Sequence, residues 1–462
     1  RASWFKFNYD MVSASDPQDD DVWEDYYVKV RKCNRFFERI GTSTIEESEK
    51  SRLTGEVHFL RAMFYFEMVK RYGGVILLDK VLTMEDNWEI PRSSEKECYD
   101  FILDDLKKAT EMLPASYGSR EKGRATKGAA YALKSRVELY DKRYEDVIKS
   151  CAEVYKLGYE LVDGTTPEKY RSIWWTTNKD NKEIIFDIQY KSPDVYNNMM
   201  VCNMVTYIND KYGDRGWGGL GPTQELVDAF EMADGSPATQ YSQAPDQVFD
   251  INTCGIYEGR EPRFYANIVF HGSQIFFNAD KGAVTVDRYL MDTPDKGDGS
   301  LTGYNVWKWI DYDNYNYPYA GASSPDFSTN WIILRYAEIY LNDAEARLET
   351  GDVEGARKAV NVIRQRVGLP ALTESDPAKL RELIRKERRI EFAFEEQRFY
   401  DVRRWKVGPE TQTTLHGVRF VSPTEFKITK TDIRTWNDRL YLTPIPHDEI
   451  VRSSVLTQNP GY

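Results

Sequence analysis

Two segments that lie far apart in the chain share one helical layout. Residues 126–158 form two amphipathic helical stretches that divide at Asp141-Lys142, and residues 335–370 have the same arrangement. Aligning residues 135–138 with residues 346–349 also aligns the starts of the second stretches, once a two-residue gap is allowed. Each segment is therefore predicted to form two antiparallel helices. The small side chains of Ala129, Ala130 and Ala132 permit close helix packing in the first segment.

A unit of roughly 34 residues made of two antiparallel helices is typical of tetratricopeptide repeats. An ordinary helical hairpin is the alternative, because such helix pairs are common. The two units are separated by residues 159–334, so any superhelix has to be assembled from distant pieces of the chain.

Helical periodicity also dominates the rest of the first 160 residues. In residues 51–73, apolar side chains recur at spacings of three and four, which predicts one buried face. These side chains are Val57, Leu60, Phe64, Met68 and Val69, and Gly73-Gly74 is expected to end the helix. A second amphipathic helix is predicted over residues 97–113, before Pro114.

Residues 160–335 have a different character. Residues 183–190 and 263–270 are rich in β-branched and aromatic side chains and are predicted to be short strands. Gly, Pro, Asn and Asp supply turns in the segments around them. The fold class is therefore predicted as mainly α, with tetratricopeptide-like helix pairs as a scaffold. Three parts are expected: helical residues 1–160, a loop-rich insert with short strands over 161–330, and a second helical part over 331–462.

The segment from Ile384 to Trp405 combines many charges with aromatic rings. Seven of its residues are basic and five are acidic. If the segment is one helix, charged side chains spaced three apart face each other. Those pairs are Arg388 with Glu391, Glu395 with Arg398, Arg398 with Asp401, and Asp401 with Arg404. A catalytic cluster and a nucleic-acid-binding arm are alternatives, but the charge is balanced, so we favour a structural network in a packed scaffold.

Composition excludes several classes of function. The net charge of −12 disfavours binding to polyanions, so no nucleic-acid partner is predicted. No apolar run is long enough to span a membrane. The five Cys and four His residues lack zinc-site spacing, and no nucleophile or phosphate-loop motif occurs. We therefore predict neither an enzyme nor a cofactor.

Two acidic stretches are candidates for a calcium site. Residues 292–300 and residues 311–314 offer the oxygen ligands that calcium accepts. Neither stretch has the spacing of an EF-hand loop. We favour solvated turns for both and leave a structural calcium as the alternative.

Several segments together resemble one known family. Residues 384–405 are similar to the charged and aromatic segment typical of SusD/RagB-type proteins, which are nutrient-binding surface lipoproteins of Bacteroidetes. Further segments resemble the family's signatures in the same order along the chain, and they are residues 55–75, 222–235, 261–272, 331–346 and 456–462.

The resemblance implies a tetratricopeptide-like scaffold that holds a loop-rich ligand domain. It also implies an oligosaccharide or polysaccharide ligand, and a SusC-like TonB-dependent outer-membrane transporter as partner, over which the protein acts as a lid. Family members carry a signal peptide and a lipid-modified cysteine. Neither is present here, and the chain starts at Arg1 without Met, so we expect a trimmed form of a protein anchored by lipid at the cell outer membrane.

Aromatic side chains in loops are the candidate ligand contacts, because a flat ring covers the apolar face of a sugar while polar side chains bind its hydroxyl groups. The densest group lies in residues 307–321, and Trp23, Trp331 and Trp405 are interpreted as core. Loop packing is the alternative role for each candidate. The predicted ligand-binding residues are Trp4, Tyr9, Trp175, Tyr196, Asn197, Asn198, Trp309, Tyr312, Tyr315, Tyr317 and Tyr319.

Two other functions remain open from sequence. RagB-like relatives suggest capture of peptides in place of glycans, and a tetratricopeptide-type scaffold for protein interactions needs no small ligand. Within the glycan hypothesis, the sequence does not identify the sugar.

Overall fold

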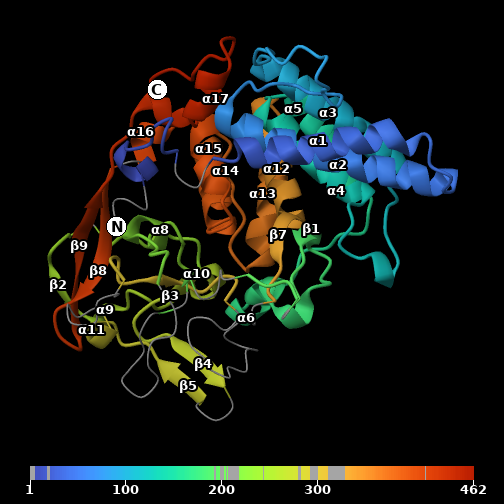
Figure 1. Ribbon diagram of the computed structural model, residues 1–462. Coiled ribbons are helices and arrows are strands. Elements are labelled where there is room, and N and C mark those ends of the chain that lie inside the picture. The colour runs from blue at the N-terminus through green and yellow to red at the C-terminus, as the bar shows by residue number, and fades with distance from the viewer. Residues whose placement is uncertain are drawn as a thin grey trace.

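The computed structural model describes residues 6–17, 21–191, 194–197, 202–203, 205, 218–242, 244–278, 282–291, 300–310, 328–411 and 413–462. Figure 1 shows helices from both ends of the chain packed together, while short strands and short helices from the middle gather beside the β8–β9 hairpin. The predicted mainly α fold with short strands is confirmed. Among the described residues, no helix has both the length and the apolar character needed to cross a bilayer.

Three long helices begin the scaffold: α1 (Trp23–Ile40), α2 (Glu47–Tyr72) and α3 (Glu95–Met112). Helix α2 ends at Gly73, whose φ of 72° is readily adopted only by glycine, as predicted. Ser94 begins α3 with a capping box, in which its side chain and that of Glu97 each bind the other's backbone N–H.

The buried face of α2 is wider than the sequence predicted. Leu60 and Phe64, assigned to the core face, are only partly buried, whereas Phe59, Ala62 and Tyr65 are fully buried. Helix α2 packs against both α1 and α3, so a single apolar stripe does not describe its environment.

The two predicted helix pairs are confirmed, and they pack on each other. The first pair is α4 (Lys127–Tyr140) with α5 (Tyr144–Val154), and the second is α12 (Tyr336–Glu349) with α13 (Val353–Arg366). Helix α12 packs against α5 and α4, so segments distant in sequence form one continuous stack. Ala129, Ala130 and Ala132 are buried, in agreement with close packing of α4.

The charged segment 384–405 is not one helix, which corrects the predicted ladder. Helix α14 (Pro377–Glu391) ends before a turn, and α15 (Gln397–Arg404) starts after it. Phe394 and Glu396 in this turn have positive φ angles of 66° and 62°. Of the four predicted pairs, only Asp401 with Arg404 is formed, at 2.7 Å. The turn separates only Glu395 from Arg398. The other two pairs lie within α14 and within α15, but there Glu391 binds Arg263 and Arg335 and Asp401 binds Arg388.

Short antiparallel strands make up the remainder of the regular structure. Strand β1 (Ile184–Ile188) pairs with β7 (Trp331–Arg335), which confirms the first predicted strand. The second prediction is half wrong, because residues 263–270 form helix α10 (Pro262–Asn267), started by Pro262, and only then β3 (Ile268–Val269). The other strands are β2 (Val248–Asp250), β4 (Gln274–Asn278), β5 (Gly282–Thr285), β6 (Asn305–Val306), β8 (Thr414–Phe420) and β9 (Glu425–Ile433).

Strand pairing links the middle of the chain to its end. Strands β2, β9 and β8 form a three-stranded sheet in that order, β3 pairs with β6, and β4 pairs with β5. The β8–β9 hairpin was not predicted. Short helices complete the structure: η2 (Lys6–Tyr9), η4 (Ser119–Glu121), α6 (Pro167–Arg171), η5 (Ser172–Trp174), η6 (Thr176–Asn178), α8 (Gln224–Val227), α9 (Ile251–Cys254), α11 (Arg288–Met291), α16 (Gly408–Thr411), η9 (Asp438–Tyr441) and α17 (His447–Arg452).

Buried clusters cross the predicted part boundaries. Tyr336, Ile339 and Ile445 belong to the same core as the N-terminal helices. A second core joins Phe264 of the middle segment to Phe426 of β9. The division of the chain into three parts at residues 160 and 330 therefore stays a prediction from the sequence, because the buried cores contain residues from both sides of these positions.

Candidate functional site

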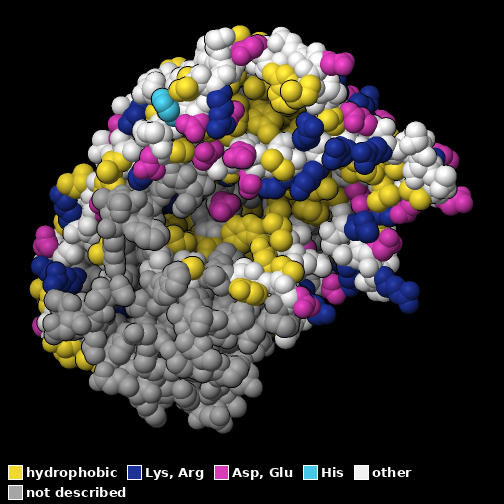
Figure 2. Space-filling model, in the orientation of Figure 1, with side chains coloured by type: hydrophobic (Ala, Val, Ile, Leu, Met, Phe, Trp, Pro, Cys, Tyr) yellow, Lys and Arg dark blue, Asp and Glu magenta, His cyan; other side chains and the backbone are white. Residues whose placement is uncertain are grey.

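A cleft of about 400 Å³ opens between α2, strand β7 and the α14–α15 turn. Figure 2 shows hydrophobic side chains gathered in the hollowed area between the positions of α2 and β7 in Figure 1. The residues that line the cleft are Tyr26, Lys29, Met63, Phe64, Glu67, Lys70, Arg71, Arg136, Tyr140, Ile188, Trp331, Ile332, Ile333, Glu395, Glu396, Gln397 and Tyr400. Aromatic and charged side chains thus share one concave surface.

The aromatic side chains come from separate elements of the scaffold. Tyr26 of α1 and Phe64 of α2 contact each other with ring centroids 5.6 Å apart, and Lys29 lies 4.3 Å from the Tyr26 ring. Burial raises the pKa of Tyr26 to about 12, so its hydroxyl group stays protonated. Trp331, the first residue of β7, is partly exposed. These rings are held by helices and a strand, which position side chains more rigidly than loops do.

A compact ionic group lies at the α2 side of the cleft. Glu67 accepts hydrogen bonds from Lys70 at 2.6 Å and Arg71 at 2.5 Å. Burial alone would raise the pKa of Glu67, but the two cations outweigh it and lower the pKa to about 2. Lys70 also lies 4.0 Å from the centroid of the Tyr400 ring. The carboxylate is therefore ionised and fully engaged at neutral pH.

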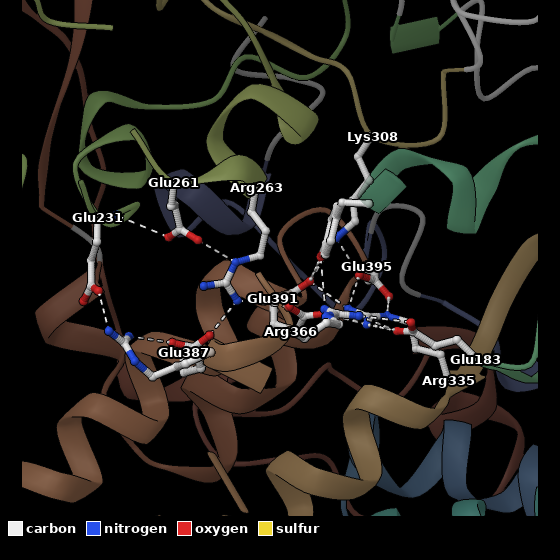
Figure 3. A network of polar contacts seen from close by, with 12 residues as sticks. Glu183, Glu231, Glu261, Arg263, Lys308, Arg335, Arg366, Glu387, Glu391 and Glu395 are labelled. Carbon is white, nitrogen blue, oxygen red and sulfur yellow. Dashed lines mark hydrogen bonds and ion pairs between the residues drawn. The ribbon is translucent and has the colours of Figure 1, made fainter. Parts of the chain in front are cut away.

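A buried polar network supports the opposite wall. We call it the Glu391 network, and Figure 3 shows it reaching from Glu231 to Glu183. As many carboxylates as cations take part, and its members are Glu183, Glu231, Glu261, Arg263, Lys308, Arg335, Arg364, Arg366, Lys386, Glu387, Glu391 and Glu395. The predicted structural network is thus confirmed, but its partners come from several elements and not from one helix.

Glu391 is the central carboxylate of this network and is fully buried. Arg335 donates to it at 2.6 Å and Arg263 at 3.0 Å, and Arg366 is a third partner. Although burial raises the pKa of Glu391, these guanidinium groups hold it well below its ordinary value. Arg335 also binds Glu395, which lines the cleft, with bonds of 2.7 and 2.9 Å. The network therefore extends to the cleft surface.

Two of the predicted ligand-binding residues, Tyr196 and Asn197, lie near the start of β7, the strand that carries Trp331. Tyr196 is 46% exposed. Asn197 donates from Nδ2 to the carbonyl oxygen of Thr329 at 2.9 Å, two residues before Trp331. The segment 194–197 is thus attached beside the strand that carries Trp331. Asn198 lies outside the described residues, as do Trp4, Tyr312, Tyr315, Tyr317 and Tyr319.

Trp309 is placed behind the cleft surface. Its side chain is only 5% exposed, and its ring packs against Trp331 at 5.8 Å and Phe394 at 6.0 Å. In this conformation the ring face that the sequence assigned to a ligand is covered by protein. Trp309 nevertheless packs against Trp331, which lines the cleft.

The other two candidates are partly buried elsewhere. The hydroxyl group of Tyr9 lies 2.9 Å from both carboxylate oxygens of Asp432, and burial followed by this carboxylate raises the pKa of Tyr9. Trp175 is partly buried, and its indole nitrogen has no hydrogen-bond partner in the described part of the chain. Neither of them lines the cleft.

Sequence reasoning missed Trp331 as a site residue, because it lies in a hydrophobic strand that looked like core. Trp23 is buried as predicted, and Trp405 is half-buried and donates to Glu345 at 2.9 Å. The sequence offered only a weak signal, because residues 331–334 are all apolar. The alternation shows in the burial, where Trp331 and Ile333 are partly exposed and Ile332 and Leu334 are buried.

Metal ligands do not cluster within the described ranges: no group of three or more His, Cys, Asp or Glu side chains there could hold an ion. The calcium candidates fall outside those ranges, apart from Ser300. A calcium site at residues 292–300 or 311–314 stays an alternative from sequence alone.

Comparison with known proteins identifies relatives along the whole chain. Residues 182–462 match the family model of the SusD family. Residues 1–139 match a family model described as starch-binding and associating with the outer membrane.

Individual relatives agree with these matches. A SusD-like protein of Bacteroides fragilis, known from a crystal structure, is 96% identical, with a TM-score of 0.96 over 100% of this chain and 90% of its own. A SusD-like carbohydrate-binding protein of the same species is 25% identical, with a TM-score of 0.78 over 98% and 89% of the two chains. SusD-like protein P25 of Formosa agariphila is 24% identical over 98% of this chain and 81% of its own length. The chain therefore belongs to the SusD family, as the resemblance of residues 384–405 and of five further segments indicated.

Proposed function

We propose that this protein captures an oligosaccharide in the cleft at the cell surface and passes it unchanged to a TonB-dependent outer-membrane transporter. The observation that carries the proposal is the concave surface on which Trp331, Tyr26, Phe64 and Tyr400 alternate with charged side chains. Membership of the SusD family and the carbohydrate-binding relative of Bacteroides fragilis support it.

The chemistry of the cleft suits a sugar ring. Aromatic rings cover the apolar C–H faces of a pyranose, and carboxylate, amide and guanidinium groups bind its hydroxyl groups at the edges. Gln397, Lys29 and Glu396 supply polar atoms to the same cleft lining as Trp331. A shallow surface of this kind binds weakly, which favours release into a channel, and tethering beside the transporter compensates by raising the effective concentration.

Capture without cleavage is supported by the state of two of the three carboxylates that line the cleft, Glu67 and Glu395. Glycoside hydrolysis needs one carboxylic acid that keeps its proton near neutral pH. Glu67 and Glu395 are both bound by cations, and the pKa of each is lowered despite burial. Neither carboxyl group is therefore poised to donate a proton to a leaving group.

The predicted loop residues extend this site in the proposal. Tyr196, Asn197 and Trp175 lie in the middle segment, and the ring of Tyr196 is more exposed than that of Trp175. The same role is proposed for Trp4, Asn198, Tyr312, Tyr315, Tyr317 and Tyr319. Trp309 supports Trp331 from its buried side. Tyr9 stays a candidate from the sequence, and it does not line the cleft.

The partner and the location rest on the family. The N-terminal match to a family that associates with the outer membrane supports a position at that membrane. A lipid anchor and a SusC-like transporter complete the proposal, because an isolated capture protein needs both to deliver its ligand.

The test is binding of a panel of polysaccharides in affinity gels and by calorimetry, starting with soluble starch. Trp331→Ala should weaken binding about tenfold, because one stacked ring contributes about 0.5–1.5 kcal/mol. Trp331→Phe should retain most of the affinity.

A matched control is Tyr340→Ala, which removes a partly buried ring from a separate hollow on α5, α12 and α13. This variant should bind like the wild type. Loss of binding in Tyr340→Ala but not in Trp331→Ala would move the site to that hollow. Binding of oligopeptides without any polysaccharide would replace the glycan proposal with peptide capture.

A further inference from the structure

Two segments share an unusual backbone conformation: the α14–α15 turn, which lines the cleft, and the chain at Trp309, which lies behind Trp331. Trp309, Phe394 and Glu396 have positive φ angles of 65°, 66° and 62°, although none of them is glycine. Non-glycine residues occupy this region at an energetic cost, so the surrounding structure has to hold them there. The rings of Trp309 and Phe394 are in contact, which brings the two strained segments together.

A single ion pair joins the two segments. Lys308, directly before Trp309, is completely buried. Its ammonium group donates to the carboxylate of Glu395 at 2.6 Å and to the carbonyl oxygen of Glu391 at 2.9 Å. Glu395 lies between Phe394 and Glu396, and Figure 3 shows Lys308 reaching toward it from another part of the chain. The pair therefore links the two positive-φ segments directly.

Neighbouring groups leave Lys308 little freedom. Its ammonium group lies 4.5 Å from the centroid of the Trp174 ring, and Arg335 holds both carboxylate oxygens of Glu395. Burial lowers the pKa of Lys308 to about 8, so its charge depends on the carboxylate beside it. Breaking such a buried pair leaves an uncompensated charge, which is costly, whereas replacing both partners by apolar groups is often tolerated.

We infer that Lys308 and Glu395 act as positioning residues for the cleft, by fixing Trp309 behind Trp331 and by setting the direction in which Glu396 and Gln397 face the cleft. The pair itself does not need to touch the ligand. The inference rests on the proposed function only in treating this cleft as the ligand site. Its structural part concerns the placement of Trp331 and can be measured without any ligand.

The first experiment is ¹⁹F NMR of the protein labelled with 5-fluorotryptophan. Trp309→Phe and Trp331→Phe assign the two resonances by removing one signal each. Lys308→Met should shift or broaden both resonances, while the signals of Trp23 and Trp88, in the N-terminal part of the chain, stay in place. Unchanged Trp309 and Trp331 resonances in folded Lys308→Met would overturn the inference.

A double variant protects the test against misfolding. Lys308→Met with Glu395→Gln removes both charges but keeps an amide oxygen that Arg335 can bind, so it should fold while still lacking the ion pair between the segments. It should displace the same two resonances and lower polysaccharide affinity by roughly five- to tenfold. A folded double variant with wild-type resonances and wild-type affinity contradicts the positioning role.

Lys386→Met is the matched control. Lys386 pairs with Glu231 at 2.8 Å in the same network, but neither residue lines the cleft. Lys386→Met should leave the Trp309 and Trp331 resonances unchanged. If it displaces them as much as Lys308→Met does, the effect belongs to the whole network, and the specific positioning role of Lys308 and Glu395 is overturned. If the wild type binds no polysaccharide, the proposed function fails, while the resonances still decide whether the pair positions Trp331.

Discussion

Trp331 lies directly against Trp309, with ring centroids 5.8 Å apart and planes inclined by 56°. One ring lines the cleft and the other is buried behind it. The sequence assigned Trp309 to ligand contact and Trp331 to the core, whereas in the structure Trp309 is buried and Trp331 lines the cleft. Substitutions can separate the two roles, since the front ring should govern binding and the rear ring should govern the shape of the wall.

Tyr196→Ala tests the loop that adjoins β7. The side chain is 46% exposed, so its removal should leave the thermal unfolding midpoint unchanged. Loss of one stacking ring should weaken polysaccharide binding about threefold to tenfold by calorimetry. Trp88→Ala is the control, because Trp88 is 57% exposed and does not line the cleft. Equal binding by Tyr196→Ala and the wild type would remove Tyr196 from the site.

Glu391→Gln tests the centre of the buried network. The substitution leaves Arg263, Arg335 and Arg366 without their shared carboxylate, so the free energy of unfolding should fall by about 3–5 kcal/mol. Urea denaturation measures this change. Glu47→Gln removes an exposed carboxylate 2.6 Å from Lys50 and should have very little effect. Similar losses in both variants would contradict the central role of Glu391.

Acid stability should depend on Glu67. Its pKa falls from the ordinary value of 4.5 to about 2 on folding, because Lys70 and Arg71 outweigh burial. A carboxyl group with a lowered pKa stabilises the fold above its unfolded pKa and loses that contribution as the pH falls. Stability should thus decline between about pH 4.5 and about pH 2. In Glu67→Gln this part of the decline should be absent, and the two proteins should converge in stability near the acid limit.

Alanine substitutions at two glycines distinguish the cost of backbone strain from the cost of steric overlap. Gly303 and Gly351 have φ angles of 73° and 88°. A β-carbon at Gly351 would meet no atom within 4 Å, so Gly351→Ala should cost only about 1–2 kcal/mol of conformational strain. A β-carbon at Gly303 would overlap the carbonyl oxygen of Val418 in β8. Gly303→Ala should therefore destabilise the protein more in thermal unfolding, and equal effects would argue against this overlap.

Local signals explain why the helix pairs could be predicted from the sequence. Gly73 and Pro114 mark where helices α2 and α3 finish, and the break at Asp141-Lys142 separates α4 from α5. Each of these signals lies at the boundary that it defines. The family resemblance rested on contiguous sequence segments, which can also be recognised without the fold, and the family matches confirm it.

The α14–α15 turn carries no such signal. Phe394 and Glu396 adopt positive φ angles that glycine or asparagine would normally mark. The contacts that hold the turn come from Lys308 and Arg335, which are 87 and 60 residues away from Glu395 in sequence. A long-range contact of this kind cannot be read from local periodicity, so the segment looked like one helix.

Tyr196, Asn197 and Trp309, which the sequence nominated, lie close to the cleft, and their contact with a ligand stays a prediction. Trp331, which lines the cleft, was assigned to the core. Alternation within a five-residue strand is a weak signal, because both faces of β7 are apolar. The other cleft rings come from helices α1, α2, α4 and α15, so only the tertiary structure brings them together.

The packing of α12 against α5 has a consequence for synthesis of the chain. Val147, Cys151 and Val154 of α5 belong to a core that also contains Tyr336, Ile339 and Ala346 of α12. A ribosome must therefore add residues 155–335 before that apolar side of α5 meets its native neighbour. Until then the nascent N-terminal helices expose apolar side chains that are prone to aggregation. Chain elongation therefore sets the earliest time at which α12 can pack against α5.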